Sequence, residues 1–168
     1  MINSILRYGA IFIILILLQV LFFNNIQFSG YVNPYVYIMF ILLLPIELPT
    51  WILLFIAFFT GLTVDFFSGT PGMHAGATVM AGFVRPYILR IISPRDGYEP
   101  GASPSMVMYG FRWFLIYTTL IATTHHFILF FLEVFRFTDF FRTILRILLS
   151  SSITITFILL AEYYRKGR

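Results

Sequence analysis

The chain has 168 residues, of which 60% are hydrophobic, 20% are aromatic and only 11% are charged. Soluble domains average about 25% charged residues, so this composition excludes an ordinary soluble domain and predicts a chain that lies in a lipid bilayer. The basic residues behind the net charge of +4 do not cluster, which excludes a nucleic-acid-binding face. The chain has no cysteine, so it has neither a disulfide framework nor thiolate chemistry.

The first two apolar runs lie in a stretch from Tyr8 to Ile46 that contains no charged side chain. One crossing takes about 20 apolar residues, so we expect two membrane-spanning helices joined by the polar stretch NNIQFSGYVNP at 24–34. These runs do not alternate apolar with polar residues, as the strands of an outer-membrane barrel would. Arg7 flanks the first run as in a signal peptide, but no small-x-small cleavage site follows, so we expect a retained helix.

Taken along the whole chain, the apolar runs predict an all-α integral membrane protein. It would be a single polytopic domain over residues 1–168, with helices at roughly 8–25, 34–48, 50–67, 73–92, 106–132 and 144–163. Pro45 and Pro49 should end the second helix. The third and fourth runs could form a re-entrant pair, although each is long enough to cross the membrane.

Basic residues near the helix ends predict the orientation. With both termini in the cytoplasm, the outer side carries Arg136, Arg142 and Arg146. The inner side then carries Arg7, Arg85, Arg90, Arg95, Arg112, Arg165, Lys166 and Arg168. This excess on the inner side predicts a multi-pass protein with two cytoplasmic termini.

Two connections are longer than simple turns. Residues 93–105 are rich in Ser, Pro and Gly and predict a mobile cytoplasmic loop. Residues 133–146 predict an amphipathic helix along the outer membrane surface, with a charged side formed by Arg136, Asp139, Arg142 and Arg146. Two interpretations stay open for this segment: a solvated, self-paired loop helix, or a docking edge for a membrane-anchored partner.

Asp65 interrupts the third apolar run, within the stretch GLTVDFFSGTPGMHAGA at 61–77. A carboxylate near a helix end costs less than one at the bilayer centre, but it should still avoid lipid. Its candidate partners are Arg146, the His125/His126 pair and the backbone amides of its own Gly-rich turn. In the structural interpretation, Asp65 caps this turn and fixes the junction of the third and fourth helices.

Small residues surround Asp65 at helical spacing. Gly61 precedes it by four residues and Gly69 follows it by four, which places all three on one helical face. On the fourth helix, small-xxx-small spacings come from Gly72, Gly76, Ala77 and Ala81. Such faces let helices approach closely in lipid, so the sequence predicts a tight junction.

Other chemistry is less compatible with the pattern. Asp65, Ser68 and His74 are the residue types of a catalytic triad, but Ser68 lies in no G-x-S-x-G elbow, so we do not expect a serine hydrolase. Adjacent His125 and His126 diverge on a helix and do not suit a single metal ion. Ionisable groups at mid-depth, which are typical of transporters, are not evident. The sequence therefore predicts a chain that is not an enzyme and has no bound metal or cofactor.

The region around Asp65 resembles the signature of the rod shape-determining protein MreD family: a glycine, an acid four residues later, then Ser-Gly and another glycine. The matching residues are Gly61, Asp65, Ser68, Gly69 and Gly72, and Gln19 and Asn33-Pro34 are similar near the first two helices. The resemblance implies a non-enzymatic scaffold of the bacterial elongation machinery in the cytoplasmic (inner) membrane. It also implies direct pairing with MreC, and through MreC a link between MreB filaments and the peptidoglycan synthase RodA with its transpeptidase.

The resemblance also supplies a second candidate, because MreD proteins are similar in fold to the substrate-binding subunits of energy-coupling-factor vitamin transporters. Those subunits usually carry A-x-x-x-A on the first helix, whereas Ala10 is followed here by Ile14. A lipid site between the third and fourth helices is a third possibility. The structural or partner-binding candidates are Gly61, Asp65, Ser68, Gly69, Gly72, Gly76, Arg136, Asp139, Arg142 and Arg146.

Overall fold

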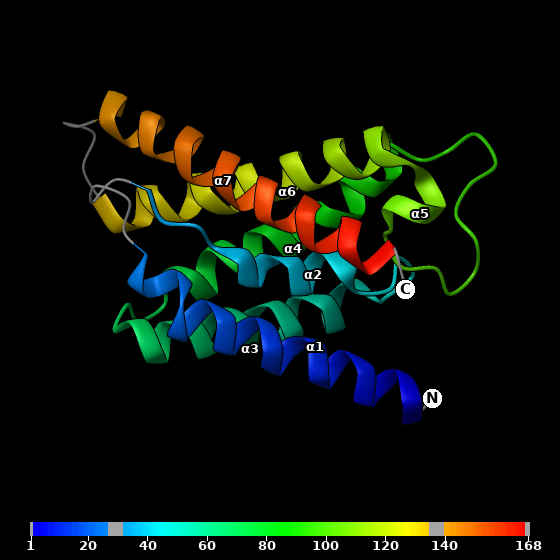
Figure 1. The fold of residues 1–168 in the computed structure, drawn as a ribbon, viewed down its shortest axis with the longest axis horizontal. Coiled ribbons are helices and arrows are strands. Elements are labelled where there is room, and N and C mark those ends of the chain that lie inside the picture. The colour runs from blue at the N-terminus through cyan, green and yellow to red at the C-terminus, as the bar shows by residue number, and fades with distance from the viewer. Residues whose placement is uncertain (1, 27–31, 135–139, 167–168) are drawn as a thin grey trace.

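A computed structural model describes residues 2–26, 32–134 and 140–166, which form a bundle of helices running broadly along one axis (Figure 1). The long helices are α1 (Ile2–Leu21), α3 (Thr50–Ser68), α4 (Met73–Ile91), α6 (Phe111–Val134) and α7 (Phe140–Lys166). The short elements are η1 (Phe23–Asn25), η2 (Val36–Ile38), α2 (Met39–Leu43) and α5 (Met106–Tyr109). α3 packs against α4, α4 against α6 and α6 against α7, while α1 lies against α3, η2 and α2.

Within the described residues, four helical segments are long and apolar enough to cross a membrane. They are Ile5–Asn25, Thr50–Ser68, Phe111–Val134 and Phe140–Arg165. Large apolar side chains are exposed on their outer faces, and on α3 these are Trp51, Phe55, Phe58, Phe59, Leu62, Phe66 and Phe67. An exposed apolar surface of this extent is typical of contact with lipid or with a partner. The described residues therefore show an all-α fold with four candidate membrane spans, and the six predicted spans remain a prediction.

The segment 32–44 corrects the second predicted helix. The sequence predicts a continuous helix over 34–48, but the chain is irregular at 32–35, forms η2 and α2, and turns into extended backbone at Leu44. The side chains of Tyr37, Ile38, Ile41 and Leu42 are fully buried. Segment 32–44 is apolar because other parts of the protein surround it. A helix that faces lipid is apolar because hydrocarbon surrounds it.

Side chains of neighbouring helices satisfy the irregular backbone of segment 32–44. Non-helical backbone at membrane depth is tolerated only where protein supplies hydrogen-bond partners. Three alternate amides donate to such partners: Asn33 to Ser150 Oγ (3.1 Å), Tyr35 to Thr154 Oγ1 (3.0 Å) and Tyr37 to Gln19 Oε1 (3.3 Å). The polar residues of α1 and α7 thus replace the hydrogen bonds that a continuous helix would have made.

Two other predicted boundaries change. The predicted helix 106–132 divides at Gly110 (φ 83°) into α5 and α6. The predicted surface helix 133–146 is wrong as a single element, because Glu133 belongs to α6 and residues 140–146 begin α7. Thr143 and Ile147 are both buried, so the start of α7 packs into the bundle; residues 135–139 lie outside the described residues.

The loop 93–105, predicted to be mobile, is fastened to the bundle. Ala102 O accepts a hydrogen bond from Ile46 N–H (2.9 Å), and Gly101 N–H donates to Glu47 Oε2 (3.1 Å). Ser103 Oγ and Tyr8 OH lie 2.8 Å apart. The loop therefore joins α1 to the α2–α3 connection, at the end of the bundle where the first and last helices begin and end (Figure 1).

Candidate functional site

The turn between α3 and α4 is held by one carboxylate. α4 begins after Gly72, which has no side chain to cap the helix, and Asp65 of α3 supplies the missing acceptors. Its Oδ1 accepts from the His74 amide (2.9 Å), and its Oδ2 accepts from the amides of Gly72 (3.1 Å) and Ala75 (2.9 Å). Free amides and the helix dipole both favour an anion at this position. Of the predicted partners of Asp65, the backbone amides of the turn are the ones found.

Side chains within the turn orient His74. Gly69 ends α3 in the left-handed conformation (φ 68°), which disfavours residues with a Cβ. Thr70 Oγ1 donates to Asp65 Oδ1 (2.9 Å) and lies 2.9 Å from His74 Nδ1, which is 3.1 Å from Asp65 Oδ1. Because Thr70 gives its only proton to Asp65, it accepts from His74, and Nδ1 carries the hydrogen. In neutral His74, Nε2 is then a hydrogen-bond acceptor.

Gly61 allows α3 and α4 to meet closely enough for this arrangement. A Cβ built at Gly61 would lie 2.5 Å from Ala75 Cα and 2.6 Å from Ala75 N, which is closer than side chains approach backbone. A Cβ built at Gly82 would lie 3.2 Å from α3, whereas one at Gly76 would lie 3.3 Å from a leucine of α6. Of the predicted small residues on α4, Gly76 therefore faces α6, while the close contact with α3 comes from Gly82, which was not part of the predicted set.

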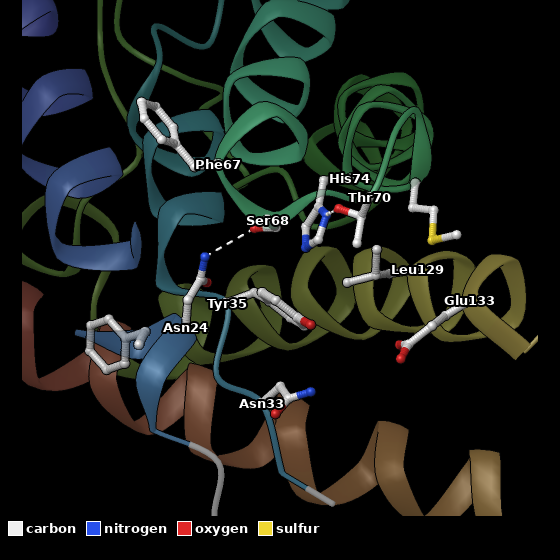
Figure 2. A pocket seen from close by; sticks show the side chains of 11 residues that line it. Asn24, Asn33, Tyr35, Phe67, Ser68, Thr70, His74, Leu129 and Glu133 are labelled. Carbon is white, nitrogen blue, oxygen red and sulfur yellow. Dashed lines mark hydrogen bonds between the residues drawn. The ribbon is translucent and has the colours of Figure 1, made fainter. Parts of the chain in front are cut away.

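A chain of polar side chains ties the end of α1 to the end of α3. Gln19 Nε2 donates to Pro34 O (3.1 Å) and to Asn24 Oδ1 (2.9 Å), and Asn24 Nδ2 donates to Ser68 Oγ (3.0 Å). Figure 2 shows the Asn24–Ser68 bond on one side of the turn and the Thr70–His74 pair on the other. Ser68 thus bonds Asn24 of η1 while His74 bonds Thr70 and Asp65, so these residues do not form a catalytic relay.

The two adjacent histidines of α6 have separate partners in the bundle core. His125 Nε2 lies 2.6 Å from Tyr37 OH, and His126 Nε2 lies 3.1 Å from Thr154 Oγ1. Tyr37 OH also lies 2.9 Å from Thr78 Oγ1. A group of three or more side chains suited to hold a metal ion does not occur in the part of the chain that the structure describes. His125 therefore connects α6 to segment 32–44, and His126 connects α6 to α7.

Arg85 is a buried charge that the sequence analysis assigned only to the orientation count. It lies in the second half of α4 with 1% of its surface exposed. Its Nε donates to Tyr117 OH (2.7 Å), its Nη1 to Pro45 O (3.2 Å) and its Nη2 to Leu44 O. The guanidinium therefore binds the free carbonyls after α2, where a cation is favoured by the helix dipole. The sequence signal for a buried charge was the presence of an arginine inside the apolar run 73–92.

Of the charged residues predicted to form an outer docking edge, the structure describes Arg142 and Arg146. Arg146 pairs with Glu133 across the α6–α7 hairpin (3.0 Å) and lies over the Phe130 ring, 4.3 Å from its centroid. Arg142 is exposed on the first turns of α7. Arg136 and Asp139 lie outside the described residues. Arg146 thus stabilises the hairpin from within.

A cavity of about 330 Å³ lies beside the α3–α4 turn. Its wall is formed by η1, the segment 33–35, the turn itself and the end of α6, and its polar residues are Asn24, Asn33, Tyr35, Ser68, Thr70, His74 and Glu133 (Figure 2). The cavity therefore adjoins the junction that Asp65 holds. The sequence left open a lipid site between the third and fourth helices but did not place this cavity, because 34–48 was expected to be one continuous helix.

A scan of protein-family models finds no match to this chain, and searches of curated proteins and of solved structures find none either.

Proposed function

We propose that this chain is a non-enzymatic membrane scaffold of the MreD type. In this role it pairs with an MreC-like periplasmic protein and helps link MreB filaments to RodA and its transpeptidase. The observation that carries the proposal is the hydrogen bonding of Asp65. Its two carboxylate oxygens accept from Thr70 and from the amides at the start of α4. A carboxylate occupied in this way stiffens a helix junction and is poorly placed for general acid–base catalysis.

The proposed topology has six passes through the inner membrane of a bacterial cell. The buried segment 32–44 and α4 would add two passes to the four apolar spans. Both ends of the chain then lie on one side, which we assign to the cytoplasm. Arg7 and Arg165 line one cleft with the loop 93–105, so basic residues gather on the side that the positive-inside rule assigns to the cytoplasm.

Co-purification from native membranes in mild detergent tests the scaffold role. Protein partners and extracted small molecules would both be identified by mass spectrometry. We expect an MreC-like protein and cell-wall synthases with the unmodified chain. Asp65→Asn replaces one acceptor with an amide donor that faces N–H groups, so it should reduce partner recovery while the chain still inserts.

The matched control is Asp96→Asn, the same chemical change in the exposed part of loop 93–105. Equal recovery of partners with Asp65→Asn and Asp96→Asn would contradict a role for the junction in assembly. Comparable amounts of both variants in the membrane fraction establish that insertion is unaffected.

The alternative is a substrate-binding subunit of an energy-coupling-factor-type transporter, and the cavity beside the α3–α4 turn favours it. Recovery of an ATPase-linked coupling protein or a stoichiometric vitamin in the same purification would establish this alternative and refute the scaffold.

A further inference from the structure

The cavity beside the α3–α4 turn has a wall of neutral hydrogen-bonding groups. The amides of Asn24 and Asn33, the hydroxyl of Ser68 and the phenol of Tyr35 all line it. Figure 2 shows these side chains arranged around a common space between η1, the turn and α6. The amide of Asn24 already bonds Gln19 and Ser68, so the groups that suit a ligand able to donate and accept are the Ser68 hydroxyl proton and the Tyr35 phenol.

The charge of the wall disfavours an anion. Glu133 is the acidic residue of the lining, and the lining holds neither lysine nor arginine among the described residues. The Glu133 carboxylate already pairs with Arg146 (3.0 Å). Among the described residues, a phosphate or carboxylate would therefore meet no basic side chain in the lining, and a cation would compete with Arg146 for the Glu133 carboxylate.

His74 adds an acceptor without a partner. Its side chain is 5% exposed, and Nε2 has no hydrogen-bond partner within the described residues. Thr70 and Asp65 hold the hydrogen on Nδ1, so Nε2 of the neutral ring can only accept. Nε2 points away from Thr70 toward the side of the cavity where Tyr35 lies (Figure 2). A buried acceptor without a partner is destabilising, so a ligand hydroxyl that reached Nε2 would supply the missing donor.

Apolar rings complete the wall. Phe23 and Phe67 line the cavity together with the Tyr35 ring, and flat apolar faces beside amides and hydroxyls complement a ring that carries both C–H and O–H groups. The volume of about 330 Å³ lies at the lower end of the range for small-molecule sites, which is about 300–1,000 Å³. The space is therefore suited to a single small ring.

We propose that this cavity binds an uncharged, polyhydroxylated ring, namely one sugar residue, presented either by a free saccharide or by the headgroup of a glycolipid. The site stands on the geometry of the cavity and does not depend on the scaffold role. Its failure is therefore distinguishable from failure of the scaffold, because partner recovery and sugar binding are separate measurements on the same chain.

Saturation-transfer NMR on the full chain in lipid nanodiscs free of glycolipid tests the site. The probes are methyl glucoside, ethanolamine and inorganic phosphate at equal concentration. We expect transfer to methyl glucoside, and none above background to the other two. Ser68→Trp fills the cavity from α3 and should abolish the signal, whereas Leu62→Trp, on the outer face of the same helix, should leave it unchanged.

A second cavity-filling variant covers the case in which Ser68→Trp fails to fold, as judged by circular dichroism and gel filtration. Met73→Trp enters from the α4 side of the same cavity and should also abolish transfer. Absence of transfer to methyl glucoside in the unmodified chain would overturn the proposal. Unchanged transfer in every folded cavity-filling variant would do so too, as would binding of ethanolamine or phosphate alone.

A final arm separates the two sources of the sugar. Nanodiscs doped with glucosyl diacylglycerol are analysed by native mass spectrometry after release of the protein. Retention of the glycolipid by the unmodified chain and by Leu62→Trp, but not by the cavity-filling variants, assigns the site to a lipid headgroup. Binding of methyl glucoside without retention of the glycolipid assigns it to a free saccharide.

Discussion

Replacing Gly61 with alanine should separate α3 from α4. A Cβ at this position would lie 2.5 Å from Ala75 Cα. Ordinary contact begins at 3.4 Å, so the helices must move apart by about 0.9 Å to accommodate it. The same movement would stretch the 2.9 Å bond between Ala75 N and Asp65 Oδ2 to about 3.8 Å, beyond hydrogen-bonding range.

The expected loss of stability combines two terms. Overpacking costs about 1–3 kcal/mol, and a hydrogen bond to a charged group contributes about 1.5–3 kcal/mol. The Asp65 bond to the His74 amide, at 2.9 Å, is exposed to the same displacement. We therefore expect Gly61→Ala to lower the free energy of unfolding by about 3 kcal/mol or more.

Two other helical glycines provide matched controls for the Gly61→Ala substitution. Gly9 has nothing within 4 Å of a built Cβ, so Gly9→Ala should stabilise α1 by up to about 1 kcal/mol through helix propensity. Gly82→Ala, with its Cβ 3.2 Å from Ala57 Cβ, should lie between the two. Unfolding by SDS in mixed micelles, followed by far-UV circular dichroism, measures all three. Equal stability of Gly61→Ala and Gly9→Ala would refute the close-contact reasoning.

Three further predictions concern hydrogen bonds away from the turn. Arg85→Lys keeps the charge but loses the fork that binds two carbonyls and a phenol, so SDS unfolding should show a loss of about 1.5–3 kcal/mol; an unchanged midpoint would contradict this. Thr154→Val removes the partner of the Tyr35 amide and should lower the free energy of unfolding by about 1–3 kcal/mol. Thr156→Val, at an exposed hydroxyl, should change it little, and equal effects of the two variants would contradict this prediction. Burial raises the pKa of Tyr98 from 10.0 to about 12, so its stabilisation should be full below pH 10 and lost as pH rises through about 12. Ultraviolet titrations of the unmodified chain and of Tyr98→Phe should differ by one phenol that ionises at about pH 12, and a difference near pH 10 would exclude this assignment.

The apolar runs predicted most long helices to within a few residues because length and hydrophobicity both report a membrane-spanning helix. The predicted helix 50–67 is α3, and 73–92 is α4. Segment 34–48 failed for a physical reason: an apolar run does not distinguish burial in protein from burial in lipid. The partners that keep its backbone non-helical, Ser150 and Thr154, lie more than a hundred residues away in sequence.

The junction at Asp65 was largely predictable from local sequence, since a carboxylate beside a Gly-rich turn has backbone amides within reach. The roles of Arg85 and His74 were not, because each depends on which helices meet. Arg85 was treated as a marker of orientation, yet it is buried against the end of α2. The docking edge at 133–146 stays a prediction: the structure adds that Arg146 pairs with Glu133, while Arg136 and Asp139 lie outside the described residues.

The hydrogen bonds of segment 32–44 also constrain the order in which the protein can be completed during synthesis. Asn33 and Tyr35 receive their partners from α7, 117 and 119 residues later in the chain. Until α7 emerges, these amides have no acceptor from α7, and the segment cannot settle at membrane depth. The last helix therefore completes the hydrogen bonds of a segment that was synthesised early. A truncated chain that ends before α7 should leave segment 32–44 without these hydrogen bonds.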